Sequence, residues 1–131
     1  MDGRIVPPDY AALPSLLRNT FENPAAVQFH HRLLAVSTFL LVALLLWRTV
    51  QAAAPRPVLH AATALMAAVT LQAATGIGTL VMVVPIALAA VHQGGSVVVL
   101  ACALWTAHTL RPQGIAAEAG GRRDARPAPA G

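Results

Sequence analysis

The longest uncharged segment of this chain constrains its fold more than any other feature. Residues 58–107 contain no Asp, Glu, Lys or Arg, an uncharged run of 50 residues. About 20 apolar residues are enough to cross a bilayer as a helix, so a run of this length must fold back on itself. Only 11% of the 131 residues are charged, whereas a soluble domain carries about 25%. The sequence therefore predicts an all-α integral membrane helical bundle.

Prolines divide the apolar part of the chain into three predicted transmembrane helices. Asn23-Pro24 suits a helix start, with Asn at the N-cap and Pro at the first helical position. Pro85 interrupts the long uncharged run and separates two helices within it. The predicted transmembrane region is residues 24–110, with helices at about 24–47, 58–81 and 85–110.

The two ends of the chain are polar and are predicted to lie outside the membrane. Residues 1–23 are expected to form an external segment with a short amphipathic surface helix near residues 10–18. Residues 111–131 are expected to be a disordered tail. The side of the membrane that holds the first link and the tail has six arginines, which are Arg48, Arg56, Arg111, Arg122, Arg123 and Arg126. An inner-membrane protein is expected, and the positive-inside rule predicts this side in the cytoplasm and the N-terminal segment outside. The arginines are scattered and lysine is absent from the sequence, which argues against a nucleic-acid partner.

Polar residues inside predicted membrane helices are candidates for function, because they are costly in lipid. They are Gln28, His30, His31, Arg32, Gln72, His92 and Gln93. His31 lies seven residues after Pro24, and His92 lies seven residues after Pro85. The first and third helices run in the same direction, so both imidazoles are expected about 10 Å below the outer helix ends. Two histidines at one depth on separate helices can supply both axial ligands of a heme iron.

Neighbouring residues fit a heme between the helices. Gly95, which follows His92 closely, leaves little side-chain bulk where a porphyrin would lie. Gln28 and Arg32 share a helix face with His31. A heme propionate is the expected partner of Arg32, because Arg pairs bidentately with carboxylates and no acidic residue is predicted at its depth.

Other interpretations of these residues remain open at this point. Spacing does not choose between His31 and His30, which points about 100° away around the helix. A membrane histidine can instead donate a hydrogen bond between helices, and glycines can simply allow helices to approach. His60 and His108 also share a level, at the cytoplasmic ends, where interfacial placement explains both of them.

The same residues resemble the C-terminal part of the heme A synthase family, over residues 1–110. The resemblance is carried, in order, by Met1-Asp2-Gly3-Arg4, Phe21-Glu22-Asn23, Gln28-Phe29-His30-His31-Arg32, Leu71-Gln72 through Gly76-Ile77-Gly78-Thr79-Leu80, and Val91-His92-Gln93. It implies a membrane oxidoreductase that converts heme O to heme A for cytochrome oxidase, by stepwise oxidation of a ring methyl to a formyl group. It also implies a four-plus-four helix architecture with a histidine pair in each half. The C-terminal pair would bind heme b, with His31 and His92 as its iron ligands and His30 in a variable position.

The chain resembles only the last three helices of that architecture. The N-terminal half of the family, with its own histidine pair and a glutamate linked to catalysis, has no counterpart here, and no catalytic residue is assigned. Activity is expected to require the missing helices, from a partner chain or a longer reading frame, and a homo-oligomer is a further option. Two other functions stay open: a stand-alone b-type cytochrome, and a structural membrane protein whose histidines only link helices.

Overall fold

The computed structural model describes residues 6–111, and the regular structure in this range is helical. Its helices are α1 (Leu16–Glu22), α2 (Pro24–Gln51), α3 (Arg56–Val81) and α4 (Ile86–Thr109). The last three are each long and apolar enough to cross a membrane, with mean hydropathies of 2.1, 1.6 and 1.8. The prediction of an all-α, multi-pass membrane bundle is confirmed.

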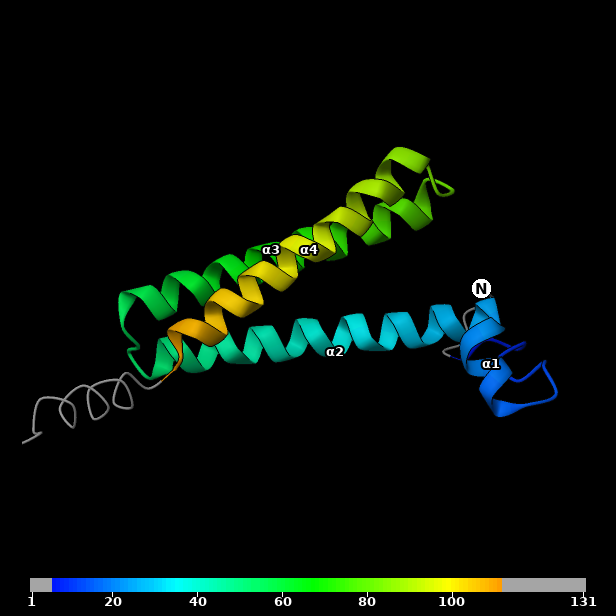
Figure 1. The fold of residues 1–131 in the computed structure, drawn as a ribbon, viewed down its shortest axis with the longest axis horizontal. Helices are drawn as coiled ribbons and strands as arrows, with labels where there is room; N and C mark the ends of the chain where they lie inside the picture. Colours follow the sequence, from blue (N-terminus) through cyan, green and yellow to red (C-terminus); the bar gives the residue numbers. More distant parts are fainter. Residues whose placement is uncertain (1–5, 112–131) are drawn as a thin grey trace, which may run out of the picture.

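The three long helices converge at one end and separate at the other (Figure 1). α3 packs against α4 along most of its length, and α2 packs against α3. Toward the end that carries α1, α2 diverges from the α3–α4 pair (Figure 1). The buried apolar cluster of Val42, Leu65 and Val69 lies where the helices converge, and Phe39, Met66 and Val99 pack around it. The opposite half of the bundle is therefore open between its two arms.

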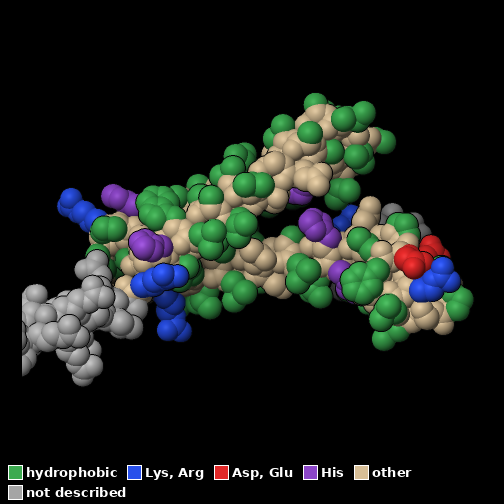
Figure 2. Space-filling model, viewed as in Figure 1, with side chains coloured by type: hydrophobic (Ala, Val, Ile, Leu, Met, Phe, Trp, Pro, Cys, Tyr) green, Lys and Arg blue, Asp and Glu red, His purple; other side chains and the backbone are tan. Residues whose placement is uncertain are grey.

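Large apolar side chains cover the outside of the long helices (Figure 2). Leu34 on α2 is 66% exposed and Ile86 on α4 is 89% exposed. A helix that is apolar all round, yet exposed, is typical of a membrane span, because lipid takes the place of a protein core. The exposed surface of these helices thus agrees with the assignment to a bilayer.

Two helices differ in extent by more than two residues from the sequence-based expectation. α2 continues to Gln51 rather than ending at residue 47, because residues 48–51 include no proline or glycine that would stop the helix. Arg48 therefore lies in the last turn of α2, where a cation is favourable to the helix dipole. The surface helix starts at Leu16 rather than near residue 10, since Ser15 caps it by accepting a hydrogen bond from the Arg18 backbone N–H at 3.2 Å. The expected disordered tail lies outside the described residues, apart from Arg111.

The turn between α3 and α4 occurs at residues 82–85, where the sequence predicts it. Val83 and Val84 have φ of 60° and 58°, in the left-handed region that β-branched residues rarely adopt. The Val84 N–H donates to the Thr79 carbonyl at 2.8 Å and so caps the end of α3. Pro85 then begins α4 at a position that needs no backbone donor.

Two buried asparagines join the external segment to the start of α2. Asn23 is the N-cap of α2, accepting from the Ala25 N–H at 3.0 Å, and its amide donates to the Asp9 carbonyl at 2.6 Å. Asn19 donates to the Leu13 carbonyl at 2.6 Å and accepts from the Leu13 N–H at 2.9 Å. Because both side chains are buried, at 5% and 7% exposed, these bonds are sheltered from competing water.

Replacing Asn23 by alanine is expected to loosen the external segment by about 2 kcal/mol, since it removes an N-cap and leaves the Asp9 carbonyl without this donor. Hydrogen exchange of the amides of residues 9–15, followed by mass spectrometry in detergent, should then accelerate about 30-fold. Thr20→Ala is the matched control, because the Thr20 hydroxyl donates to the Leu16 carbonyl within α1. Unchanged protection in Asn23→Ala would contradict this role of the asparagine.

Candidate functional site

α2 and α4 diverge in the open half of the bundle, and one histidine on each helix faces the other across the opening. The ring centroids of His31 on α2 and His92 on α4 are 6.2 Å apart, and the ring planes are nearly perpendicular, at 85°. Figure 2 shows the molecule hollowed between the two arms, with histidine side chains at the hollow. The two histidines predicted at equal depth are thus neighbours across this opening.

The separation of the two rings fits one metal held between them. A metal–imidazole bond is about 2.0 Å, and a ring centre lies about 1.1 Å behind its nitrogen, so rings on opposite sides of one metal would have centroids about 6.2 Å apart. The observed 6.2 Å is within that geometry. Among residues 6–111, no group of three or more His, Cys, Asp or Glu side chains is placed to hold a metal ion. Two histidines supply two ligands, which is the number that a porphyrin-bound iron leaves open.

His92 is fixed by two polar side chains of α3. The Gln72 amide donates to the His92 backbone carbonyl at 2.7 Å, and the Thr75 hydroxyl lies 3.2 Å from His92 Nδ1. The same hydroxyl donates to the Gln72 carbonyl at 3.0 Å. Because a hydroxyl has one proton to give, Thr75 accepts a hydrogen bond from His92 Nδ1–H. This arrangement leaves Nε2 of His92 as the nitrogen with a free lone pair.

Two glycines leave room for these polar contacts between α3 and α4. A Cβ added at Gly76 of α3 would lie 2.7 Å from Cε1 of His92, so only glycine leaves the ring where it is. On α4, a Cβ at Gly95 would collide with the Gln72 amide oxygen. In this structure Gly95 therefore has the helix-packing role that the sequence left open, and its predicted role beside a porphyrin remains a prediction. A Cβ at Gly94 would meet nothing within 4 Å.

His30 faces the external segment rather than His92. Its Nε2 lies 2.8 Å from the Tyr10 hydroxyl, in a hydrogen bond between residues 20 positions apart. The Tyr10 ring also packs edge-on against Phe29, with centroids 5.5 Å apart. Of the adjacent histidines, His31 is the one that the structure brings to His92.

The remaining predicted site residues are less constrained by the structure. Gln28 and Arg32 are exposed on α2, on the face of His31, and Arg32 is already engaged in an interaction. Sequence reasoning missed Thr75 and Gly76 as partners of His92. One signal was present, because Gln72, Thr75 and Gly76 lie on one helical face at i, i+3 and i+4.

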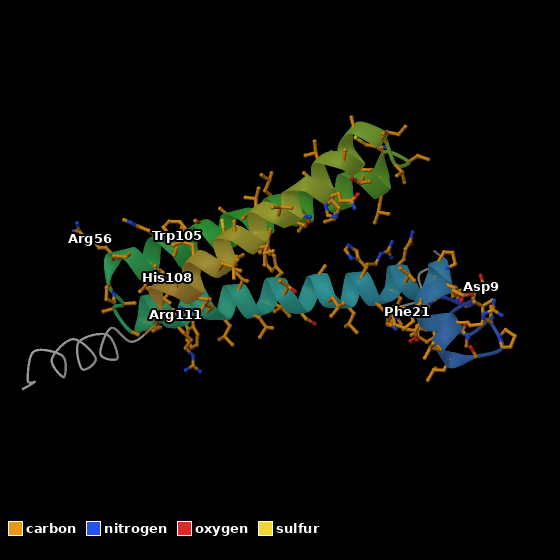
Figure 3. All side chains as sticks on the ribbon, viewed as in Figure 1. Asp9, Phe21, Arg56, Trp105, His108 and Arg111 are labelled. Carbon is orange, nitrogen blue, oxygen red and sulfur yellow. The ribbon has the colours of Figure 1, made fainter. Side chains whose placement is uncertain are left out.

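The cationic end of the bundle lies opposite the external segment. Figure 3 shows Arg56, Trp105, His108 and Arg111 at that end, with Asp9 and Phe21 at the other. His108 lies in the last turn of α4 and is exposed, as is His60 near the start of α3. This placement agrees with an interfacial role for both.

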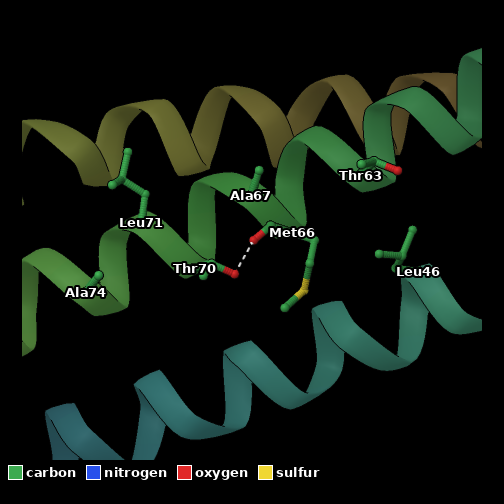
Figure 4. A pocket seen from close by; sticks show the side chains of 7 residues that line it. All are labelled: Leu46, Thr63, Met66, Ala67, Thr70, Leu71 and Ala74. Carbon is green, nitrogen blue, oxygen red and sulfur yellow. Dashed lines mark hydrogen bonds between the residues drawn. The ribbon is translucent and has the colours of Figure 1, made fainter.

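A second concavity is an apolar groove between α2 and α3 (Figure 4). Its volume is about 530 Å³, and it is lined by Leu46, Thr63, Met66, Ala67, Thr70, Leu71 and Ala74. Thr70 satisfies its own hydroxyl by donating to the Met66 carbonyl at 2.8 Å. With no ionisable side chain in its lining, the groove offers apolar packing and no acid–base or ligand chemistry.

Comparison with known proteins identifies the family of the chain. The sequence pattern of the COX15-CtaA family, described as cytochrome oxidase assembly protein, matches residues 1–104, including both histidines. The chain belongs to this family. It is 43% identical over 106 residues to heme A synthase COX15 of Bos taurus, covering 81% of this chain and 26% of that protein.

Bacterial family members match the same part of the chain. Heme A synthase of Bradyrhizobium sp. (strain BTAi1) is 46% identical over 99 residues, which cover 76% of this chain and 27% of the relative. The enzyme of Nitrosospira multiformis is 38% identical over 113 residues, covering 86% of this chain and 32% of the relative. The chain thus spans about a quarter to a third of the length of these relatives. No solved structure matches it.

Proposed function

We propose that this chain is the heme b-binding C-terminal portion of a heme A synthase-type membrane oxidoreductase. The observation that carries the proposal is the pair His31 and His92, which approach to 6.2 Å from two separate membrane helices. Membership of the COX15-CtaA family and the names of the relatives support the reaction, the conversion of heme O to heme A for cytochrome oxidase.

Each site residue has a physical role in this proposal. His31 and His92 would hold the heme iron, and His92 is itself held by Gln72 at its backbone carbonyl and by Thr75 at Nδ1. Arg32 and Gln28, on the same face as His31, are the partners of the heme propionates. When bound, the heme supplies one-electron redox chemistry at its iron.

The proposal extends to orientation and partners. The arginine-rich end faces the cytoplasm and the external segment faces the other side of the inner membrane, as the positive-inside rule predicts. Asp9 and Glu22 are the acidic residues within 6–111, and both lie outside the spanning helices. A carboxylate needed for catalysis would thus come from helices of the remaining two-thirds to three-quarters of the enzyme, in the same or a partner chain.

The test is expression of the chain in cells that contain heme O, with and without the N-terminal part of a longer relative. We expect the purified chain to hold low-spin heme b at nearly one per chain, with heme A formed only when the N-terminal part is present. Heme b without heme A in both cases would instead identify a stand-alone b-type cytochrome. A folded chain that holds no heme would contradict both functions and leave a structural membrane protein.

A further inference from the structure

The hydroxyl of Thr75 is the group that decides which nitrogen of His92 is available. It lies 3.2 Å from Nδ1 and gives its own proton to the Gln72 carbonyl at 3.0 Å. A lone histidine in lipid interchanges its two neutral tautomers, and only the form with a proton on Nδ1 presents Nε2 as a ligand. A hydrogen-bond acceptor at Nδ1 selects that form and fixes the orientation of the ring.

The site around Thr75 is built to hold this one contact. Gly76, the next residue, lets the imidazole lie against the backbone of α3, where any Cβ would be within 2.7 Å of its Cε1 atom. Gln72, one turn earlier, anchors the His92 backbone carbonyl at 2.7 Å. Thr75 thus contacts the ring at Nδ1, Gly76 makes room for its edge, and Gln72 holds the backbone of His92. The ring cannot turn over without losing the Thr75 contact.

We propose that Thr75 is a positioning residue that fixes His92 in its Nδ1–H tautomer and so presents Nε2 to a heme iron. This inference rests on the proposed heme site, but the tautomer itself is a property of the chain without heme. In this proposal α3 supplies no ligand to the iron, but its Thr75 controls the geometry of the ligand on α4.

The test compares Thr75→Val, which removes the hydroxyl at constant shape, with Thr75→Ser, which retains it. Thr70→Val is the matched control, because Thr70 is on the same helix and donates to the Met66 carbonyl in the same way, but lines the apolar groove away from His92. Circular dichroism of each variant in detergent verifies the fold. Without the Thr75 hydroxyl, the Gln72 carbonyl still accepts its ordinary backbone hydrogen bond within the helix. We therefore expect α3 to form in all three variants.

Two measurements decide the result. The ¹⁵N shifts of the His92 ring in the heme-free chain should indicate Nδ1–H in the wild type, Thr75→Ser and Thr70→Val, and a mixture of tautomers in Thr75→Val. Heme transfer to apomyoglobin should be about tenfold faster from Thr75→Val than from the other three chains. Unchanged ring shifts in Thr75→Val would overturn the inference, as would an unchanged transfer rate. A wild type that binds no heme, yet changes tautomer in Thr75→Val, would support the role of Thr75 and refute the proposed heme function.

Discussion

Replacement of His92 by alanine is expected to lower heme retention about 100-fold or more, because loss of a partner that merely orients a metal ligand already costs about 10–100-fold. Alanine would leave one side of the iron open, and the described spanning helices contain no Asp or Glu that could replace the imidazole. The measurement is heme per chain after detergent purification, from the pyridine hemochrome spectrum. His31→Ala should behave in the same way, because the two rings are 6.2 Å apart on opposite sides of the same opening.

His30→Ala and Gln93→Ala are the matched controls for the two ligand variants. Each removes a polar side chain next to a proposed ligand, but His30 is bonded to Tyr10 and Gln93 is exposed on α4. Both should retain heme at the wild-type level. Loss of heme in His30→Ala but not in His31→Ala would reverse the assignment of the α2 ligand.

Substitution of Gly76 by alanine is expected to weaken heme binding while leaving the helix intact. The new methyl group would lie 2.7 Å from Cε1 of His92, so the ring must move away from α3 and lose the Thr75 contact. Alanine is about 1 kcal/mol more favourable than glycine within a helix, so α3 itself should not be destabilised. We expect heme dissociation to accelerate about tenfold or more, with an unchanged helical circular dichroism signal.

Gly94→Ala and Gly78→Ala are controls for a general effect of an added methyl group on the packing of the helices. A methyl group at Gly94 would meet nothing, and one at Gly78 would make an ordinary contact with Leu88 at 3.4 Å. Both variants should bind heme like the wild type. If Gly94→Ala or Gly78→Ala loses as much heme as Gly76→Ala, the specific contact with His92 is not the cause.

The fold followed largely from local signals in the sequence. Pro24 and Pro85 mark the starts of α2 and α4, and the lack of charge in residues 58–107 required two spans. The extension of α2 to Gln51 was not evident, because arginine is tolerated in a last helical turn and apolar content is a poor measure of where a helix stops. Nor did the sequence indicate left-handed valines, since the residues around Val83 and Val84 include no glycine to mark such a turn.

The histidine pair was predictable in position but not in detail. Equal spacing from two prolines placed His31 and His92 at one depth, while the choice against His30 depended on the family resemblance. The external segment explains that choice physically, because Tyr10 forms a hydrogen bond with His30, 20 residues further along the chain. The role of Thr75 depends on the register of α3 against α4, which is set by Gly76 and Gly95 together and is a tertiary property that helical periodicity does not contain.

The proposed function depends on ligation of one heme iron by His31 and His92 from two different helices. Electron paramagnetic resonance of the oxidised, purified chain tests it most directly, because the spin state of ferric heme depends on whether both axial positions hold a strong ligand. We expect a low-spin signal in the wild type, strongly anisotropic because the two imidazole planes are 85° apart. We also expect loss of that signal in both His31→Ala and His92→Ala. A low-spin signal that persists in either variant would contradict the assignment of that histidine.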